Sequence, residues 1–518
     1  MSYPRSRCAP GVLLFGFAIL GFVGCSGSSK APFEAGQASV SMKEASREAN
    51  TEDYNHIVDN PFLSAREHPQ STFSTAVDTA SYSNVRRYLN GGQLPPKDAV
   101  RIADLLNYFD YAYPEAKGEH PVALGLEMAA CPWNPQHHLV KIAVKARTIS
   151  PSEMPPRNFV FLIDTSGSMA AENRLPLVKQ SLELLVQQLG ERDRVSIVSY
   201  AGDASLRLPT TAGHQNQKIR LAINGLLASG STNGGGGIVM AYDQAQRSFI
   251  EGGVNRVILA TDGDFNVGVS SDGELVRLIE QKRQTGIYLT VLGYGMGNLK
   301  DNKLEQLAHH GNGHYAYIDS IDEARKVFVD QGGALAIVAK DVKLQVEFNH
   351  LQVNAYRLIG YENRVLRNED FKDDAKDAGD MGSGHTCTAL YEIVPVGVAS
   401  PLQSAGDLKY QRAGSETPAA KTGEWLTVRM RYKNPDSEQG KELATTMPAA
   451  GLAKHPSDDF RFAASVATFG MLLRDSEYKG TATFDAVREW ASGALGNDRN
   501  GLRSEFLGLV GKARQLKK

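Results

Sequence analysis

The stretch Asp164-Thr165-Ser166-Gly167-Ser168-Met169 decides how the rest of the chain is understood. It follows the apolar run Phe159-Val160-Phe161-Leu162-Ile163 and precedes a helical pattern, so an acidic residue and two hydroxyls stand where a buried strand ends. In open α/β sheets, ligands bind in the crevice beyond the carboxyl ends of the strands. One carboxylate and two hydroxyls, without a nearby lysine or histidine, form a poor catalytic set but a good partial shell for a hard cation such as Mg²⁺.

Strand and helix patterns alternate from Arg157 to about Gln331. Such alternation indicates crossover units and a mostly parallel sheet that helices cover on both faces. The predicted strands are Phe159–Ile163, Val195–Tyr200, Val257–Ala260, Tyr288–Leu292 and His314–Ile318, with Ser205–Leu208 at an edge, and the predicted helices are Leu175–Leu189, Ile219–Leu227, Ile238–Ile250, Glu274–Gln284 and Lys303–His309. We therefore expect an α/β fold with a doubly wound, Rossmann-like sheet.

Sheet-like patterns flank this segment on both sides, where apolar and polar residues alternate as in half-buried antiparallel strands. The predicted strands are Ser71–Asp78, Val122–Met128, Leu139–Ala146, Val342–Phe348, Leu351–Leu358, Thr388–Val394 and Trp425–Tyr432, and two helical patterns cover Ser83–Asn90 and Val100–Tyr108. We expect a β-rich domain, with residues 61–156 as an α/β-rich first part and 332–435 as the remainder, into which residues 157–331 are inserted. Helical spacing then predicts a helical segment within residues 436–518.

The amino-terminal residues have the features of an export signal. Arg5 and Arg7 precede a short apolar segment, Gly11 to Val23, which is too short to span a bilayer comfortably. The segment ends in Phe22-Val23-Gly24-Cys25, which resembles the lipobox of bacterial lipoproteins except that Phe22 replaces the usual aliphatic residue. The resemblance implies that residues 1–24 are a signal peptide and that Cys25 is lipidated. A plain signal peptide with an incidental cysteine is the alternative.

The residues that follow Cys25 bear on where the protein resides. Ser26 occupies the position where a residue other than Asp is compatible with sorting to the outer membrane of Gram-negative bacteria. Residues 25–60 contain much Ser, Ala, Glu and Lys and few large apolar side chains, which is typical of a flexible tether. We therefore expect a lipid-anchored protein of the bacterial cell envelope that resides at the outer membrane.

Composition argues against a nucleic-acid partner and leaves open whether two cysteines form a disulfide. The 518 residues carry a formal net charge of -2 with 22% charged residues, so there is no basic excess and we expect no nucleic-acid partner. Cys131 and Cys387 remain in the mature chain. An oxidising envelope would permit a disulfide between them, and two buried thiols are equally compatible with the sequence.

Two further loops supply oxygen ligands in the places that a cation at Asp164 requires. Thr232 precedes the glycine run 234–237, which opens a helix, and Asp262 follows the strand Val257–Ala260. With Asp164, Ser166 and Ser168 they resemble the metal-ion-dependent adhesion site of a von Willebrand factor type A domain, and all five positions are filled in the expected order.

This resemblance implies a role for each of the five residues. Ser166, Ser168 and Thr232 would coordinate Mg²⁺ directly, while Asp164 and Asp262 would act through bound waters. Weak neutral ligands would leave the ion electrophilic, so a protein partner offering an acidic residue would complete its shell. Mn²⁺ or Ca²⁺ would fit the same description. The alternative is that these residues only cap helices and turns.

The resemblance extends to the bacterial von Willebrand type A lipoproteins, through Thr75-Ala76-Val77-Asp78-Thr79-Ala80-Ser81-Tyr82, Cys131-Pro132-Trp133-Asn134 and Thr388-Ala389-Leu390-Tyr391-Glu392. That family implies an architecture more than a specific function.

The chain contains no Gly-x₄-Gly-Lys-[Ser/Thr], His-Glu-x-x-His or Gly-x-Ser-x-Gly element, so we expect a binding protein and not an enzyme. A passive scaffold with a structural cation, or a hydrolase, is the alternative. His309, His310 and His314 indicate a helix end more than a transition-metal site.

Overall fold

The computed structural model describes residues 50–75, 78–232, 234–263, 265, 272–402 and 416–517, and the statements below refer to these residues. From Asn50 onward they form one compact unit. The predicted signal peptide, Cys25 and most of the predicted tether lie outside the described residues. No helix within the described ranges combines the length and the apolar character needed to cross a membrane.

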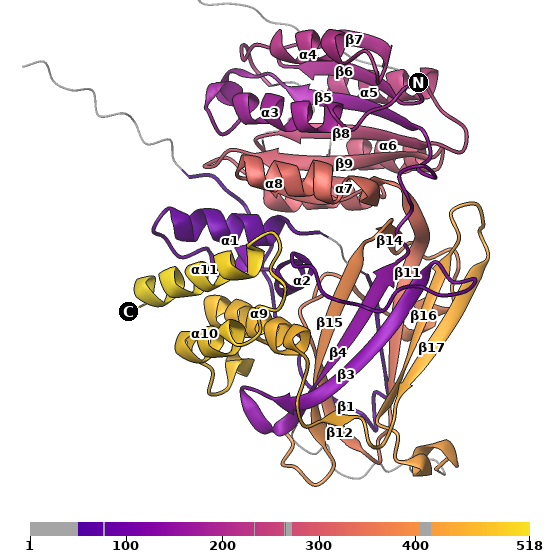
Figure 1. Ribbon diagram of the computed structural model, residues 1–518, viewed down its shortest axis with the longest axis vertical. Helices are drawn as coiled ribbons and strands as arrows, with labels where there is room; N and C mark the ends of the chain where they lie inside the picture. Colours follow the sequence, from indigo (N-terminus) through magenta and orange to yellow (C-terminus); the bar gives the residue numbers. More distant parts are fainter. Residues whose placement is uncertain are drawn as a thin grey trace, which may run out of the picture. The chain divides into compact units, whose positions relative to one another are not determined.

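The central part of the chain forms a six-stranded sheet in the order β10-β9-β8-β5-β6-β7 (Figure 1). Neighbouring strands are parallel except for β7, which lies at one edge and runs antiparallel to β6. The strands are β5 (Arg157–Asp164), β6 (Arg194–Tyr200), β7 (Ala204–Ala212), β8 (Val254–Thr261), β9 (Ile287–Tyr294) and β10 (Tyr315–Ile318). Each predicted strand of this region therefore has a counterpart, and the edge position of Ser205–Leu208 is confirmed.

Helices cover both faces of this sheet, and two separate apolar clusters join them to it. One face carries α3 (Leu175–Val186), α4 (Asn216–Asn224) and α8 (Ile321–Arg325), and the other carries α5 (Gly234–Arg247), α6 (Asp272–Arg283) and α7 (Asp301–His310). The glycine run at the start of α5 lets this helix approach the sheet closely. A Cβ atom on Gly237 would lie 2.9 Å from the Cβ atom of Tyr200. The run is therefore a packing feature.

Two further sheets pack face to face around a third apolar core. The first contains β1 (Leu63–Ser64), β12 (Val353–Ile359), β15 (Thr386–Pro395), β4 (Asn134–Ala146), β3 (Val122–Cys131) and β18 (Leu452–Ala453) in this order. The second contains β13 (Val365–Leu366), β2 (Gln70–Ser74), β11 (Ile337–Phe348), β16 (Leu426–Lys433) and β17 (Gly440–Met447), with β14 (Gly379–Gly382) beside β11. Strands from before and after the α/β segment pair directly, because β4 pairs with β15 and β2 with β11.

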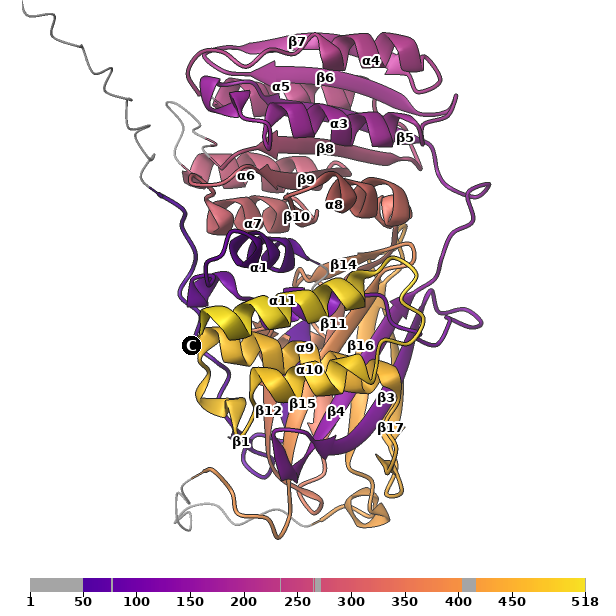
Figure 2. The same ribbon diagram turned by 60° about the vertical axis from the view of Figure 1, so that its left-hand side comes forward.

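Five helices share an apolar cluster with the outer side of the first of these sheets (Figure 2). They are α1 (Ala80–Asn90), α2 (Ile102–Asn107), α9 (Asp458–Arg474), α10 (Phe484–Ser492) and α11 (Leu502–Leu516). The helical part thus starts at Asp458, and β17 precedes it within a range for which the sequence predicts only helices. β17 is an edge strand with little buried surface on either side, so it lacks the apolar alternation that predicts a strand.

Cys131 and Cys387 both lie on strands of the first sheet, β3 and β15. Both are buried thiols, and no bond joins them. Burial raises the pKa of the Cys131 thiol well above its usual value. Of the two alternatives that the sequence left open, the structure therefore has the buried thiols.

Candidate metal site at the strand ends

Asp164 is the last residue of β5, and three neighbours hold its carboxylate in place. The Ser166 amide donates to Oδ1 at 2.9 Å, while the hydroxyls of Tyr200 and Thr261 donate to Oδ2 at 3.1 and 3.2 Å. The side chain is fully buried. Burial raises the pKa of Asp164 to about 6, although the hydrogen bonds from Ser166 oppose this change and the Asp262 carboxylate adds to it.

Ser166 and Ser168 follow in a short turn after β5. Their hydroxyl oxygens lie 3.0 Å apart, and Ser166 is buried whereas Ser168 is exposed. Two backbone hydrogen bonds connect this turn to the loop before α5, from Gly167 N to Gly230 O (3.0 Å) and from Ser229 N to Thr165 O (2.8 Å). The two predicted ligand loops are therefore joined directly.

Thr232 lies two residues beyond Gly230 in this second loop and is half-buried. The hydrogen bonds of the loop bring Thr232 to the same edge of the sheet as Asp164, Ser166 and Ser168. Asp262 follows β8, the strand that pairs with β5 along its length. The structure therefore places all five predicted residues at the carboxyl ends of neighbouring strands and at the start of α5.

The Asp262 carboxylate has an unusual environment. Its side chain is fully buried and lies 3.1 Å from Nη1 of Arg174, but neither of its oxygens accepts a hydrogen bond within the described structure. Buried carboxylates normally have hydrogen-bond partners, because their desolvation is costly. Asp262 therefore has unused capacity to bind a water or a cation, and this observation fits a site for an oxygen-liganded metal.

Arg174 is the residue of this site that sequence reasoning missed. Besides the ion pair with Asp262, its guanidinium donates to the backbone oxygens of Ser168 (2.6 Å) and Met296 (2.9 Å). It therefore ties the first ligand loop to Asp262 and to the loop after β9. No motif marks this arginine, because it stands just before α3 and all its partners lie on other loops.

The chemistry of the donor set favours a hard cation. Carboxylates and hydroxyls are ligands for Mg²⁺, Ca²⁺ or Mn²⁺, whereas zinc sites use His and Cys. Within the described ranges there is no group of three or more His, Cys, Asp or Glu side chains arranged to hold a metal. The histidines near the end of α7 do not converge either: His309 contacts Arg364, His310 contacts Glu280, and His314 packs against His385.

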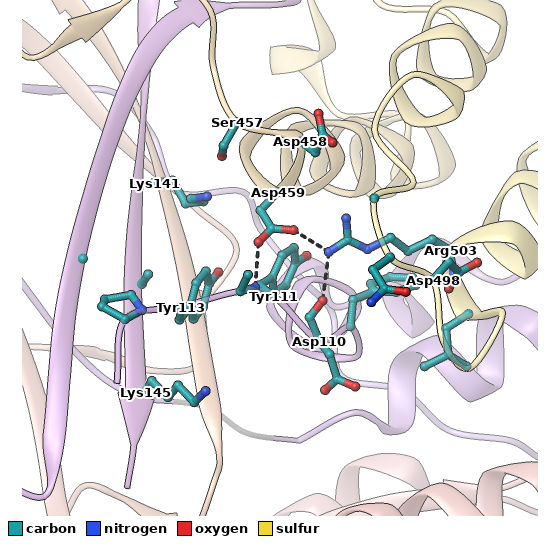
Figure 3. A pocket seen from close by; sticks show the side chains of 18 of the residues that line it. Asp110, Tyr111, Tyr113, Lys141, Lys145, Ser457, Asp458, Asp459, Asp498 and Arg503 are labelled. Carbon is teal, nitrogen blue, oxygen red and sulfur yellow. Dashed lines mark hydrogen bonds and ion pairs between the residues drawn. The ribbon is translucent and has the colours of Figure 1, made fainter. Parts of the chain in front are cut away.

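A large hollow of about 1200 Å³ lies elsewhere, between β3 and β4 and the carboxyl-terminal helices (Figure 3). At its centre Asp459 accepts hydrogen bonds from the Ala112 amide (2.7 Å) and from Arg503 (2.5 Å). Arg503 also donates to the backbone oxygen of Asp110 at 2.9 Å. These central charges hold the chain together, and the hollow shares no residue with the strand-end site.

Comparison with known proteins places the chain in a family. The model of the von Willebrand factor type A domain matches residues 158–330, a model described as von Willebrand factor matches 48–141, and one described as Uncharacterized protein YfbK, C-terminal, matches 333–516. Uncharacterized protein YfbK of Escherichia coli (strain K12) is 42% identical over 466 residues, covering 88% of this chain and 80% of that protein. The chain belongs to the YfbK family. Its α/β part is a von Willebrand factor type A domain, and the predicted fold class is confirmed.

Other relatives share less of their length. Inter-alpha-trypsin inhibitor heavy chain H3 of Homo sapiens is 29% identical over 183 residues, which are 33% of this chain and 20% of that protein. The magnesium-chelatase 60 kDa subunit of Cereibacter sphaeroides is 30% identical over 183 residues, 33% of this chain and 32% of that protein. A solved structure, von Willebrand factor type A from Catenulispora acidiphila, has 14% identity and a TM-score of 0.40, covering 76% of this chain and 91% of that one.

Proposed function

We propose that this protein binds an acidic side chain of a protein partner through Mg²⁺ at the strand-end site. The observation that carries this proposal is the Asp262 carboxylate, which is fully buried without a hydrogen bond and follows the strand next to the one that ends at Asp164, Ser166 and Ser168. A buried carboxylate in such surroundings is costly unless a cation or water compensates it. Ser168, which is exposed at the same edge, makes the site accessible from outside.

The residues divide into two roles. Ser166, Ser168 and Thr232 would hold the cation directly, and Asp164 and Asp262 would hold its waters, as the family resemblance implies. When bound, Mg²⁺ supplies a coordination position for a carboxylate oxygen of the partner. Two carboxylates and the Arg174 guanidinium leave the site with one net negative charge. A divalent cation reverses that sign, which favours an anionic partner group.

The rim of the site supports recognition of a protein surface. Ser168, Ser229 and Gly230 are small and exposed, so they leave room for a partner to approach. Met296, whose backbone oxygen is bound to Arg174, has 57% of its surface exposed. A partner carboxylate bound at the cation would therefore have an apolar neighbour beside it, an arrangement that is common in protein interfaces.

We propose a binding role and not a catalytic one. In the described structure the Ser166 and Ser168 hydroxyls bond to each other, and no histidine lies within hydrogen-bond distance of either. A serine nucleophile needs an adjacent base. A passive scaffold with a structural cation remains the competing function, and partner capture separates the two.

The proposed location is the outer membrane, where acyl chains on Cys25 would anchor the protein and residues 25–60 would act as a tether. Each buried CH₂ group of the anchor contributes about 0.8 kcal/mol. Metabolic labelling with a fatty-acid probe tests the anchor directly. Labelling is expected in the wild type and should be absent from Cys25→Ala; equal labelling of both would contradict the lipid attachment.

Cross-linking on intact cells tests the binding function. Wild-type protein should capture a partner in the presence of Mg²⁺, and Asp262→Ala should lose it together with Mg²⁺ binding in calorimetric titration. Asp203→Ala is the matched control, because Asp203 is an exposed acidic residue on a neighbouring loop outside the predicted ligand set. Capture that resists EDTA would contradict the proposal. Mg²⁺ binding that depends on Asp262 without any captured protein would instead favour the structural cation.

A further inference from the structure

The loop after β9, Gly295–Lys300, forms one wall of the strand-end site and is called the wall loop below. Its Met296 oxygen accepts a hydrogen bond from Arg174, which also contacts Ser168 O and the Asp262 carboxylate. The loop packs directly on the residue after Asp262. A Cβ atom on Gly263 would lie 2.4 Å from Asn298 O and 2.7 Å from the Lys300 nitrogen. A shift of the wall loop would therefore change the positions of Arg174 and Asp262.

The first described residues of the chain, Asn50–Asn55, hold the wall loop from the opposite side and are called the arm. The Thr51 amide donates to Gly297 O at 2.9 Å, and the Asp53 amide donates to Leu299 O at 3.0 Å. In return the Gly297 amide donates to the Glu52 carboxylate at 2.7 Å. A parallel bridge joins Asp53 and Lys300. The wall loop is thus bonded to Arg174 on one side and to the arm on the other.

Glu52 fixes the arm to α1. Its carboxylate accepts two hydrogen bonds of 2.8 Å from Arg87 and one of 2.6 Å from the Tyr88 hydroxyl. The side chain is only 3% exposed. Glu52 is therefore the point at which the arm, the wall loop and α1 meet.

The rest of the arm contributes no buried side chain. From Asn50 to Pro61 every residue is half-buried or exposed, and Phe62 is the first buried residue of the described chain. The arm is held by hydrogen bonds and one shielded ionic contact, so it can separate from the wall loop without opening an apolar core. The arm lies within residues 25–60, the segment proposed as the tether, near the end of that segment that is bonded to the body.

We infer that the arm positions the wall loop, with Glu52 as the positioning residue, and that release of the arm weakens cation binding at the strand-end site. The inference rests on the proposed function, because it requires a cation at that site. It adds that the segment leading to the membrane anchor controls the site. A pull on the tether would act first on the arm, then on the wall loop, and through Arg174 on Asp262.

Mg²⁺ titration calorimetry on the full-length mature protein tests this inference. Glu52→Ala should weaken Mg²⁺ affinity by roughly 5- to 20-fold, in the range typical of coupling between sites. The matched control is Asp59→Ala, which removes another carboxylate of the amino-terminal segment. Asp59 pairs with Arg474 at 2.6 Å, and among the described residues it forms no hydrogen bond or ion pair with the wall loop. Its removal should leave the affinity within about twofold of the wild type.

Hydrogen exchange supplies a readout that a purely structural role would not move. Amide exchange of Thr51, Asp53 and Gly297, whose amides donate between the arm and the wall loop, should accelerate in Glu52→Ala, while thermal unfolding of the two alanine variants should be similar. Glu52→Gln keeps an oxygen acceptor for the Gly297 amide, so it should retain more Mg²⁺ affinity than Glu52→Ala. Wild-type affinity in Glu52→Ala would overturn the inference and leave the proposed function intact, whereas absence of Mg²⁺ binding in the wild type would overturn both.

Discussion

Buried carboxylates occur at two places in this protein, and their surroundings differ. Between α1 and α8, Asp319 and Glu323 both contact Arg86, at 2.5 and 2.7 Å, and the buried Lys326 lies nearby over the Tyr108 ring. At the strand ends, Asp164 has hydroxyl and amide partners, and Asp262 has only Arg174 without a hydrogen bond. In the first cluster Arg86 also contacts the partly exposed Glu505, and both buried carboxylates accept hydrogen bonds from Arg86, whereas in the second cluster the Asp262 carboxylate accepts none.

The pKa values of the first cluster show the effect of its cations at Glu323, whereas burial outweighs Arg86 at Asp319 and raises its pKa. Burial alone would raise the pKa of Glu323, but Lys326 and Arg86 outweigh burial and hold it below its usual value. At the strand ends no such cation contacts Asp164, and burial raises its pKa to about 6. The comparison teaches that the buried carboxylates between α1 and α8 have a hydrogen-bonding cation, while the Asp262 carboxylate has none and its cluster has room for a further positive charge.

Removal of Arg86 should have the largest effect on stability. Arg86→Met would leave Asp319 and Glu323 buried beside Lys326 alone, and breaking a buried ion pair costs about 3–5 kcal/mol of unfolding free energy. Urea unfolding measures this loss. The control is Arg429→Met, because Arg429 and Glu347 form a pair that is about one-third and nearly one-half exposed. Such surface pairs contribute about 0–1 kcal/mol, so equal losses in the two variants would contradict the comparison.

Substitution of Asp262 should destabilise the metal-free protein less than removal of Arg86 does. In EDTA, Asp262→Asn breaks the buried 3.1 Å ion pair with Arg174, but it also removes the repulsion between the Asp262 and Asp164 carboxylates, so the loss of unfolding free energy should stay below the about 3–5 kcal/mol of a broken buried pair. Saturating Mg²⁺ at about 100 times its Kd should stabilise the wild type by about 2.7 kcal/mol and the variant by much less. Thermal unfolding with and without Mg²⁺ measures both effects. A similar Mg²⁺ shift in wild type and variant would show that the cation binds elsewhere.

Glu52 should contribute stability that is lost in acid. Burial opposes ionisation of this carboxyl, but hydrogen bonding and charge from Arg87 lower its pKa from 4.5 to about 2. Its stabilising contribution is therefore complete above about pH 4.5 and disappears as the pH falls toward 2. The difference in unfolding free energy between wild type and Glu52→Gln should shrink across this interval. A difference that stays constant would contradict the assigned contact.

Much of the α/β part and its edge residues could be predicted from the sequence because both depend on local patterns. Strand and helix periods, and the positions of Asp164, Thr232 and Asp262 relative to them, are visible in short windows of sequence. Arg174 and Glu52 were missed because their roles arise from long-range contacts. Glu52 stands in a stretch with few apolar residues, which the sequence assigns to a tether, and it acquires its role only by contact with Arg87 and Gly297.

The strand β17 was missed for a related reason. The sequence signal for strands is the burial of alternate residues, and a sheet edge with little burial on either side does not produce it. Hydrogen bonding to β16 defines this strand, and backbone pairing leaves no direct trace in residue types. Short-range sequence patterns therefore predict the strands that bury apolar side chains in a core. They do not predict a strand such as β17, which is stabilised mainly by hydrogen bonds to its neighbour.

The two buried thiols also bear on how the protein can mature. Cys131 and Cys387 lie on different strands of one sheet without a disulfide between them, and each is buried within an apolar core. The described body therefore does not need oxidising conditions or a disulfide-forming catalyst to reach its fold. It can be produced in a reducing host as readily as in an oxidising compartment, and its shape will not respond to thiol reductants.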